Sequence, residues 1–296
     1  MTQQKPAIIV ISSHVVRGTV GNRAAGFALE VLGYPVWLVP TVTLPWHPGQ
    51  GVAERIVPPA DEFSTLLDNL SNSPALNEVG AVLSGYLGNV EQVAAVAHLV
   101  DAVKARNSEA LYALDPVLGD ASAGEEGRLY VPKEQAEEIR NQLLPKADMI
   151  TPNPFEMGWL AGLASPNNNE DLLAAARSLK VETVLATSAS AMMRGNIANL
   201  LLHEDKATLA EHRAMNNPPN GLGDLAAALM LGNYMSNGDA VAALKKTSAS
   251  LCEVMMSAAR AGIDELPLEA SVGSLLQPRM PVDVRTLGTV VVKPRK

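Results

Sequence analysis

Short apolar runs alternate with longer stretches of helical periodicity along the whole chain. Residues 7–12 (AIIVIS), 80–84 (GAVLS) and 110–115 (ALYALD) are apolar runs that end in a polar residue. Such runs are typical of buried parallel strands. Helical patterns follow, for example at 89–105 and 133–144. Because strands and helices alternate, we expect an α/β fold with a doubly wound, mostly parallel sheet that carries helices on both faces.

The same pattern predicts the remaining elements. They are a helix closed by Gly33, strands at 35–39, 147–151 and 181–188, a hairpin that begins at 196, helices at 152–163, 171–180, 222–236 and 238–262, and TVVV near the end as a candidate final strand. Residues 40–57 are rich in proline and glycine and predict an irregular flap, and the polar stretch 118–131 predicts a mobile loop. No repeat or linker interrupts the pattern, so we expect a single domain over residues 1–296.

Composition excludes several classes of function. The 296 residues carry a formal charge of −8 and no basic stripe, so nucleic acid is a poor partner. Cys252 is the only cysteine, which excludes an internal disulfide and a multi-cysteine metal site. No segment reaches the roughly 20 apolar residues of a membrane helix, and the N-terminus lacks the pattern of a signal peptide. We therefore expect a cytoplasmic protein with no membrane partner.

The sharpest chemical signal is Asn220-Gly221-Leu222-Gly223-Asp224 at the start of a predicted helix. The two glycines let the backbone approach a ligand, and the helix N-terminus adds its positive dipole end. This combination suits negative charge that develops on a transferring phosphoryl group. Asp224 is placed to accept a proton from an attacking hydroxyl. The alternative is an ordinary helix start with an acid in its first turn.

Two further motifs carry carboxylates. In TPNPFE, Asn153 and Glu156 could face the same way and hold a hydrated Mg²⁺, or they could form a capping box. In DPVLGD, Asp115 ends a strand and could complete a metal and phosphate shell, or it could be a turn residue. Ser13, Asp115, Thr151 and Thr187 all fall at the ends of predicted strands, and ligands of such sheets bind beyond the carboxyl ends of the strands.

Two common nucleotide-binding patterns are missing. The sequence has no G-x-x-x-x-G-K-[ST] segment, which excludes a P-loop. The spacing GTVGNRAAG, with Gly18 and Gly21, does not match G-x-G-x-x-G and is weak evidence for NAD. Ser13 or His14 could instead hydrogen-bond a polar aromatic ligand. No group of histidines and carboxylates has the spacing of zinc ligands.

Taken together, these motifs resemble those of pyridoxal kinases in the ribokinase-like superfamily. The quoted segments are ISSHVVRGTVGNRAA, LSGYLG, LDPVLGD, ADMITPNPFEM and NGLGDLAAA, in that order along most of the chain. Hydroxymethylpyrimidine kinases share only the DPV, TPN and GxGD elements. The resemblance implies an ATP-dependent kinase that phosphorylates the 5′-hydroxyl of a B6 vitamer. It also implies Mg²⁺, a monovalent cation such as K⁺, and a homodimer.

The resemblance also implies roles for individual residues. Asp224 is the expected catalytic base, with Gly221 and Gly223 as the anion hole. The expected substrate-binding residues are Ser13, His47, Pro48, Tyr86 and Asp224 itself. The expected nucleotide-binding residues are Asp115, Tyr130, Asn153, Glu156, Thr187, Ser188, Gly221, Leu222 and Gly223, with Asp115 and Glu156 next to the metal.

Three positions depart from the family pattern. Ser12 stands where glutamine is usual, Pro48 replaces a threonine that touches the substrate, and Leu222 replaces the threonine of GTGD. Proline has no side-chain donor, so the contact at position 48 is lost or remodelled, and Trp46 could supply an apolar wall. These departures keep two alternatives open. One is a hydroxymethylpyrimidine or other small-alcohol kinase, and the other is a non-catalytic vitamer-binding protein.

Overall fold

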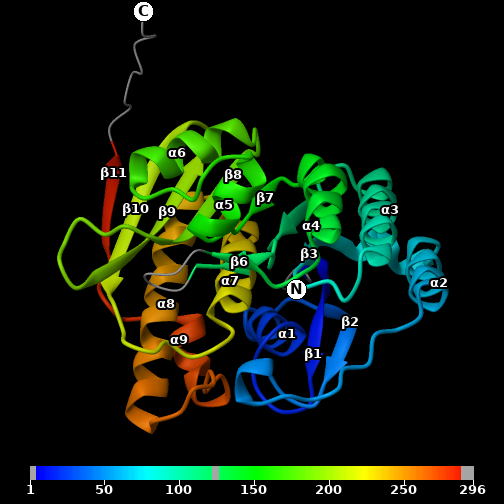
Figure 1. Ribbon diagram of the computed structural model, residues 1–296, viewed down its shortest axis with the longest axis horizontal. Helices are drawn as coiled ribbons and strands as arrows, with labels where there is room; N and C mark the ends of the chain where they lie inside the picture. Colours follow the sequence, from blue (N-terminus) through cyan, green and yellow to red (C-terminus); the bar gives the residue numbers. More distant parts are fainter. Residues whose placement is uncertain (1–4, 122–126, 288–296) are drawn as a thin grey trace, which may run out of the picture.

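A single large sheet organises the part of the chain that the structure describes. This computed structural model describes residues 5–121 and 127–287. Within them the sheet has nine strands in the order β11-β10-β9-β8-β7-β4-β3-β1-β2 (Figure 1). Its parallel part consists of β1 (Ala7–Val15), β2 (Val36–Leu44), β3 (Val79–Ser84), β4 (Leu111–Leu114), β7 (Met149–Ile150) and β8 (Thr183–Ala189). Three antiparallel strands extend it: β9 (Asn196–His203), β10 (Lys206–Arg213) and β11 (Asp283–Leu287). The expected α/β fold with a mostly parallel sheet is confirmed.

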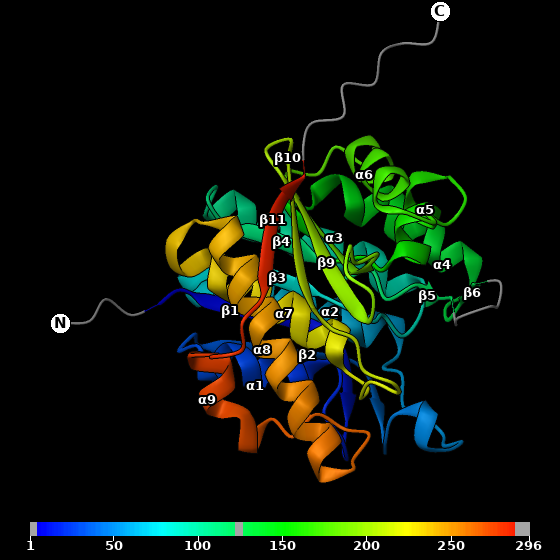
Figure 2. The same cartoon turned by 90° about the vertical axis from the view of Figure 1, so that its left-hand side faces the viewer.

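Helices cover both faces of the sheet (Figure 2). One face packs against α2 (Ala60–Ser71), α3 (Glu91–Arg106), α4 (Lys133–Glu138), α5 (Pro154–Ala161) and α6 (Asn169–Ser178). The other packs against α1 (Asn22–Val31), α7 (Leu222–Asn237) and α8 (Ala240–Ala261), with the short α9 (Val272–Leu276) beside α8. Successive residues of β1 alternate between these two cores: Ile9 and Ile11 join the first, and Ile8 and Val10 the second.

The direction of the chain through the sheet reverses between β1 and β3. The chain leaves β1 through α1 to reach β2 on one side, whereas β3, on the other side of β1, leads on to β4. In doubly wound sheets the carboxyl ends of the strands at such a switch point form the ligand crevice. Ser12 and Ser13, near the end of β1, and Gly85, directly after β3, therefore lie where a site is expected.

The structure corrects several expected elements. β2 runs to Leu44 and does not give way to a loop at Pro40. It is an edge strand, where a proline costs no hydrogen bond of the sheet. The helix α2 and the strand β11 were not predicted. β11 is polar and half exposed, and it forms by pairing with β10. TVVV lies outside the described residues.

Two predicted segments are only partly as expected. The helix expected at 133–144 is α-helical to Glu138 and continues as a π-helical turn (Ile139–Leu143) and a 3-10 turn (Leu144–Lys146). The expected loop at 118–131 contains the short strands β5 (Gly119–Asp120) and β6 (Arg128–Leu129), and residues 122–126 lie outside the described part. Among the described residues, no helix is both long and apolar enough to span a bilayer.

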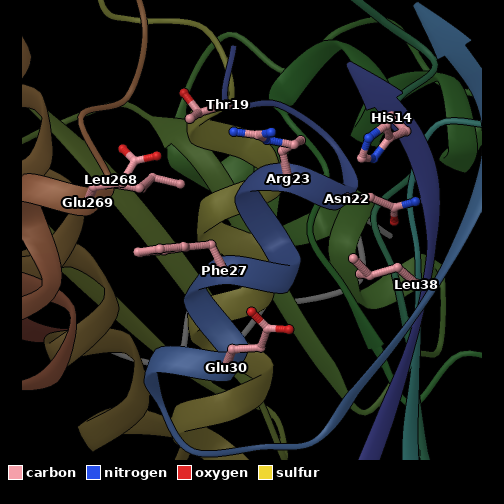
Figure 3. A pocket seen from close by; sticks show the side chains of 9 residues that line it. All are labelled: His14, Thr19, Asn22, Arg23, Phe27, Glu30, Leu38, Leu268 and Glu269. Carbon is pink, nitrogen blue, oxygen red and sulfur yellow. The ribbon is translucent and has the colours of Figure 1, made fainter. Parts of the chain in front are cut away.

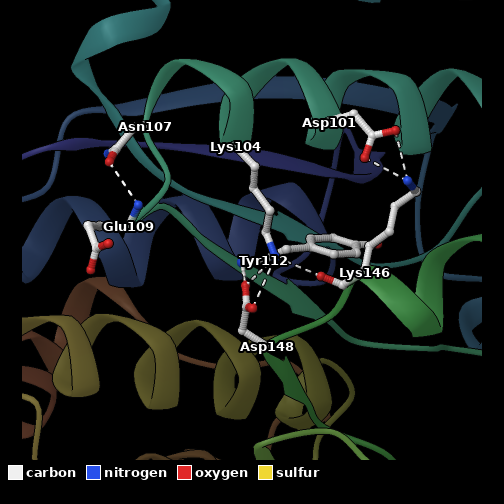
Figure 4. A network of polar contacts seen from close by, with 7 residues as sticks. All are labelled: Asp101, Lys104, Asn107, Glu109, Tyr112, Lys146 and Asp148. Atoms are coloured by element: carbon white, nitrogen blue, oxygen red, sulfur yellow. Dashed lines mark hydrogen bonds and ion pairs between the residues drawn. The ribbon is translucent and has the colours of Figure 1, made fainter.

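A polar network fastens the amino-terminal ends of the central strands (Figure 4). The Asp148 carboxylate accepts a hydrogen bond from the Tyr112 backbone N–H at 2.7 Å and pairs with Lys104 Nζ at 2.8 Å. The Asp148 carbonyl oxygen accepts from Thr183 N at 3.0 Å. The residue therefore connects β4, α3 and β8, at the end of the sheet opposite the switch-point crevice.

We expect Asp148→Ala to lower the free energy of unfolding by about 1–3 kcal/mol, because it leaves the Tyr112 N–H without its partner. Asp101→Ala is the matched control. It removes a carboxylate that pairs with Lys146 Nζ at 2.6 Å on the surface, and such pairs contribute roughly 0–1 kcal/mol. Urea unfolding of both variants measures the difference, and equal losses would contradict the role of Asp148 in holding β4, α3 and β8 together.

Candidate active site

Asp224 lies in the first turn of α7, where the chain folds back sharply. Gly221 precedes the helix with φ 92°, in the left-handed region. A β-carbon on Gly221 would lie 2.3 Å from the carbonyl oxygen of Thr19, so no larger residue fits without displacing the backbone. Gly223 faces open space, with no atom within 4 Å of where its β-carbon would be. The loop therefore leaves room for a ligand in front of the helix N-terminus.

The environment of Asp224 raises the pKa of its carboxyl group toward neutral pH. Burial of the carboxylate raises its pKa to about 6, although hydrogen bonds from the backbone N–H groups of Gly21 and of Asp224 itself act in the opposite direction. Gly21 has φ 56°, and a β-carbon there would lie 2.2 Å from the Ser13 carbonyl oxygen. Gly21, which the sequence suggested only as part of an incomplete dinucleotide motif, therefore places its backbone N–H next to Asp224, the candidate base.

A second carboxylate, Asp115, lies close to Asp224, and a third, Glu156, lies close to Asp115. Asp115 follows β4 and is buried, and it accepts a hydrogen bond from Thr151 Oγ at 3.1 Å. Burial first, and then repulsion from Glu156 and Asp224, hold the pKa of Asp115 well above its usual range. Burial also raises the pKa of Glu156 to about 7. Acids that repel one another in a buried site are the environment in which a divalent cation is most strongly stabilised.

Glu156 and Asn153 form the predicted capping box at the start of α5. Asn153 Oδ1 accepts from Glu156 N, and Glu156 Oε2 accepts from Asn153 N, both at 2.9 Å. Glu156 Oε1 also accepts from Leu118 N at 2.8 Å, and Asn153 Nδ2 donates to the Gly119 carbonyl oxygen at 2.8 Å. The capping alternative is confirmed, and it fixes the turn after Asp115 to α5. The metal role of Glu156 stays a prediction.

The residues expected on the substrate side come from the end of β1, the segment after β3 and the flap. Ser13 is half-buried on β1, and Tyr86 follows β3. Arg55 Nη1 donates to the Tyr86 hydroxyl oxygen at 2.7 Å, a contact that the sequence did not suggest. His47 and Pro48 lie on the flap, where His47 Nδ1 accepts from Gly49 N at 3.1 Å. Burial lowers the pKa of His47, although Asp264 acts in the opposite direction.

Hydrogen bonds hold this flap down. Arg17 Nη1 donates to Gln50 Oε1 at 2.8 Å, and Gln50 Nε2 donates to Glu265 Oε1 at 2.6 Å. Arg17 Nη2 pairs with the same Glu265 oxygen at 3.2 Å. Asn220, at the start of the glycine loop, donates its N–H to the Asp264 carbonyl oxygen at 3.0 Å. The flap and the glycine loop are therefore fastened to one segment, residues 264–265, which the sequence did not single out.

The residues expected on the nucleotide side lie at the ends of β7 and β8 and near β6. Thr187 donates its N–H to the Pro152 carbonyl oxygen at 3.0 Å, which brings it beside the TPN segment. Ser188 is exposed and has φ 55°. Tyr130 is 54% exposed, and burial of its hydroxyl with repulsion from Asp120 and Glu156 raises its pKa to about 12. Of these residues, Tyr130 is near Glu156 and Thr187 is beside the segment that carries Asn153.

A separate open hollow of about 180 Å³ follows the outer face of α1 (Figure 3). Arg23, Phe27 and Glu30 of α1 line it, together with His14 and Glu269 from neighbouring segments. None of the three carboxylates Asp115, Glu156 and Asp224 borders it. The chemistry therefore belongs at the strand ends and not in this larger hollow.

Comparison with known proteins agrees with this geometry. A family model described as phosphomethylpyrimidine kinase matches residues 59–269. The chain is 32% identical to pyridoxal kinase PdxY of Corynebacterium diphtheriae over 95% of its own length and 99% of that protein. It is 35% identical to pyridoxal kinase PdxY of Leifsonia xyli over the same shares. The chain belongs to the pyridoxal kinase family.

The solved structures extend the likeness to three dimensions. Pyridoxal kinase from Leishmania donovani in complex with ADP and pyridoxamine superposes with a TM-score of 0.87 at 27% identity, covering 96% of this chain and all of that one. The pyridoxal kinase from Trypanosoma brucei gives a TM-score of 0.81 at 25% identity. The pyridoxal kinase resemblance that the motifs suggested is confirmed, and so is the ribokinase-like fold.

Proposed function

We propose that the protein is a pyridoxal kinase, which transfers the γ-phosphoryl group of ATP to the 5′-hydroxyl of pyridoxal or a related B6 vitamer. The observation that carries this proposal is the position of Asp224, at the glycine-flanked start of α7 and beside the buried acid Asp115, which in turn lies near Glu156. The named activities of the relatives and the ADP and pyridoxamine complex of the Leishmania enzyme support the same reaction.

In this mechanism Asp224 accepts the proton of the substrate hydroxyl as its oxygen attacks the γ-phosphorus. The backbone N–H groups of Gly221, Leu222 and Gly223, at the positive end of the α7 dipole, stabilise the charge that develops on the transferred group. Thr187 and Ser188 bind the phosphates from the end of β8, and Tyr130 closes over the nucleotide. Ser13 and Tyr86 hold the pyridine ring, with His47 and Pro48 on the flap above it.

The carboxylates of Asp115 and Glu156 fit Mg²⁺, which prefers oxygen ligands and keeps several of its waters. Among the described residues no group of three or more histidines, cysteines or acids could enclose a metal by itself. An ion held by one or two carboxylates and the ATP phosphates matches that donor set. Bound Mg²⁺ would neutralise charge on the phosphates, and we also propose a monovalent cation such as K⁺.

The raised pKa of Asp115 makes the stability of the ligand-free protein depend on pH. The pKa of Asp115 is raised on folding, so the folded state binds its proton more tightly than the unfolded state does. Stability from this group is present at low pH and is lost as the pH rises. We expect Asp115→Asn, without ligand, to have a higher melting temperature than the parent protein at pH 8. The difference should vanish as the pH falls toward about 4, the unfolded value for aspartate.

Thermal melts of both proteins from pH 4 to 8 test this expectation, and activity assays accompany them. The substitution keeps the acceptor for the Thr151 hydroxyl but removes the charge. We expect a more stable protein with less activity, a usual trade-off at functional sites. A variant that is less stable than the parent at pH 8 would contradict the raised pKa.

A second candidate acceptor is a hydroxymethylpyrimidine or another small alcohol. Pro48 and Trp46 favour it, because the flap presents a proline and an aromatic ring where a hydroxyl would otherwise contact the substrate. A coupled assay with Mg-ATP compares pyridoxal, pyridoxine, pyridoxamine and hydroxymethylpyrimidine. Highest kcat/KM for a B6 vitamer supports the pyridoxal kinase, highest kcat/KM for the pyrimidine supports the alternative, and binding without turnover supports a non-catalytic binder.

We further propose that residues 1–296 form one domain, that the protein acts in the cytoplasm, and that it is a homodimer. The continuous sheet from β2 to β11 supports one domain. Sedimentation velocity measures the oligomer, and a monomer at micromolar concentration would contradict the dimer.

A further inference from the structure

The alternation of side chains along β1 directs Ser12 toward the candidate base. Ile8 and Val10 pack into the core beneath α1 and α7, and Ser12 is the next residue on that face of the strand. Ser12 is 2% exposed. Asp224 is in the first turn of α7, and its carboxylate reaches the same place from the opposite side. A hydroxyl is therefore buried between strand and helix where the preceding positions carry apolar side chains.

The Ser12 hydroxyl has no hydrogen-bond partner within residues 5–121 and 127–287. The backbone of Ser12 is firmly held, because its carbonyl oxygen accepts from Asn22 Nδ2 at 3.0 Å. An unpartnered buried hydroxyl costs about 1–3 kcal/mol, so an internal partner is strongly favoured. The hydroxyl is buried and satisfied by no group of the described chain.

Beside this hydroxyl is a cavity of about 10 Å³. Its polar lining consists of Ser12, Asp115 and Asp224, and apolar residues of β1, β3, α1 and α7 line the rest. Gly85 completes the wall opposite Ser12. A β-carbon there would lie 2.6 Å from Ser12 Oγ and 3.9 Å from Asp224 Oδ1. The cavity exists because residue 85 has no side chain.

We propose that this cavity holds one water molecule, and that Ser12 positions the base through it. The volume is about that of one water probe, and internal waters need two to four polar partners. A water has two O–H donors for the carboxylates of Asp115 and Asp224, which can only accept when ionised. Its oxygen accepts from the Ser12 hydroxyl. Every hydrogen-bonding group around the cavity is then satisfied.

This inference rests on the proposed function and identifies a positioning residue for it. A donor between Asp115 and Asp224 offsets the repulsion of the two acids and fixes one oxygen of Asp224. Together with the backbone N–H groups of Gly21 and Asp224, which also bond this carboxylate, the water fixes its direction toward the hydroxyl of the substrate. Because Ser12 acts through the water, its loss should alter the orientation of the base more than the affinity for ATP or vitamer.

The first test is a high-resolution crystal structure of the parent protein and of Ser12→Ala. We expect an ordered water within hydrogen-bonding distance of Ser12 Oγ and of an Asp224 oxygen in the parent, and a shifted or less ordered water in the variant, which keeps only the two carboxylates as partners. A dry cavity in the parent protein would overturn the proposal. This result does not depend on which alcohol the enzyme phosphorylates.

The second test is kinetic. We expect Ser12→Ala to lower kcat roughly tenfold, the value of one hydrogen bond to a charged group, with KM for ATP and vitamer changed less than about twofold. Ser250→Ala is the matched control, since it removes a buried hydroxyl of α8 that bonds the Ser274 carbonyl oxygen at 2.8 Å. It should lower stability and leave kcat unchanged. An unchanged kcat in Ser12→Ala would contradict the positioning role.

A double variant separates the water from simple packing. In Ser12→Ala/Gly85→Ala the new β-carbon at position 85 lies 3.2 Å from the β-carbon of residue 12 and fills the cavity. If Ser12 acts through a water, kcat stays low. If the cavity needs only to be filled, kcat recovers and the proposal fails. Absence of B6 phosphorylation by the parent protein would refute the proposed function alone, because the crystallographic test would still decide on the water.

Discussion

Asp224→Asn should lower kcat for pyridoxal phosphorylation by about 10²–10⁴-fold, the usual contribution of a positioned general base. Asparagine has nearly the same shape but cannot accept the proton of the attacking hydroxyl. Because Asp224 contributes mainly to the chemical step, we expect KM for ATP to change little. Steady-state kinetics with Mg-ATP and saturating vitamer measure the effect.

The stability of the Asp224→Asn variant shows whether a loss of activity comes from misfolding or from the missing base. Burial raises the pKa of Asp224 to about 6, so its charge is unfavourable in the ligand-free protein at neutral pH. Asp224→Asn should therefore be at least as stable as the parent protein. Asp264→Asn is the matched control: Asp264 is an exposed acid whose backbone holds the same loop. It should keep full activity, and full activity in Asp224→Asn would refute the base assignment.

Gly221→Ala and Gly223→Ala should differ in stability although both impair catalysis. At Gly221 the left-handed φ of 92° and the Thr19 carbonyl oxygen 2.3 Å from a β-carbon force the loop to move. Such strain costs of order 1–3 kcal/mol, and we expect kcat to fall by at least about 100-fold as the N–H groups lose their alignment. Gly223 meets no atom within 4 Å, so alanine there should leave the unfolding free energy nearly unchanged.

The open space at Gly223 is where the transferred phosphoryl group is expected. A methyl group there should hinder the phosphates and lower kcat/KM for ATP by roughly tenfold or more. Denaturant unfolding and ATP kinetics on both variants separate the two effects. If Gly223→Ala is fully active, the anion hole lies elsewhere. If Gly221→Ala is as stable as the parent, the turn is more tolerant than its geometry indicates.

Motifs close together in sequence were predicted well, because they depend on local backbone chemistry. The glycine pair before Asp224 could be interpreted as a helix N-terminus with a ligand cradle, and α7 begins at Leu222 as expected. The Asn153 and Glu156 spacing contained the capping box that the structure has. Apolar runs gave the central strands, because a strand buried on both faces must be apolar throughout.

Contacts between distant segments could not be predicted in the same way. In the sequence, Gly21 belonged only to a segment that does not match the G-x-G-x-x-G pattern. Only the fold brings its N–H to Asp224, some 200 residues further along the chain. Arg55 and Glu265 have no distinguishing pattern, yet they bind Tyr86 and the flap. β11 is too polar to be recognised alone and exists because β10 offers it an edge.

The sequence by itself determined the fold class, the pyridoxal kinase resemblance and the residue types of the candidate site. These features follow from hydrophobic periodicity and from short motifs, which depend on residues close together in the chain. Only the tertiary structure decided that Asp115 shares a buried site with Glu156 and Asp224, where desolvation raises all three pKa values and repulsion from the other two acids further raises that of Asp115. It also decided that Ser12 faces the base, because the pleat of β1 and the packing of α7 bring the two together.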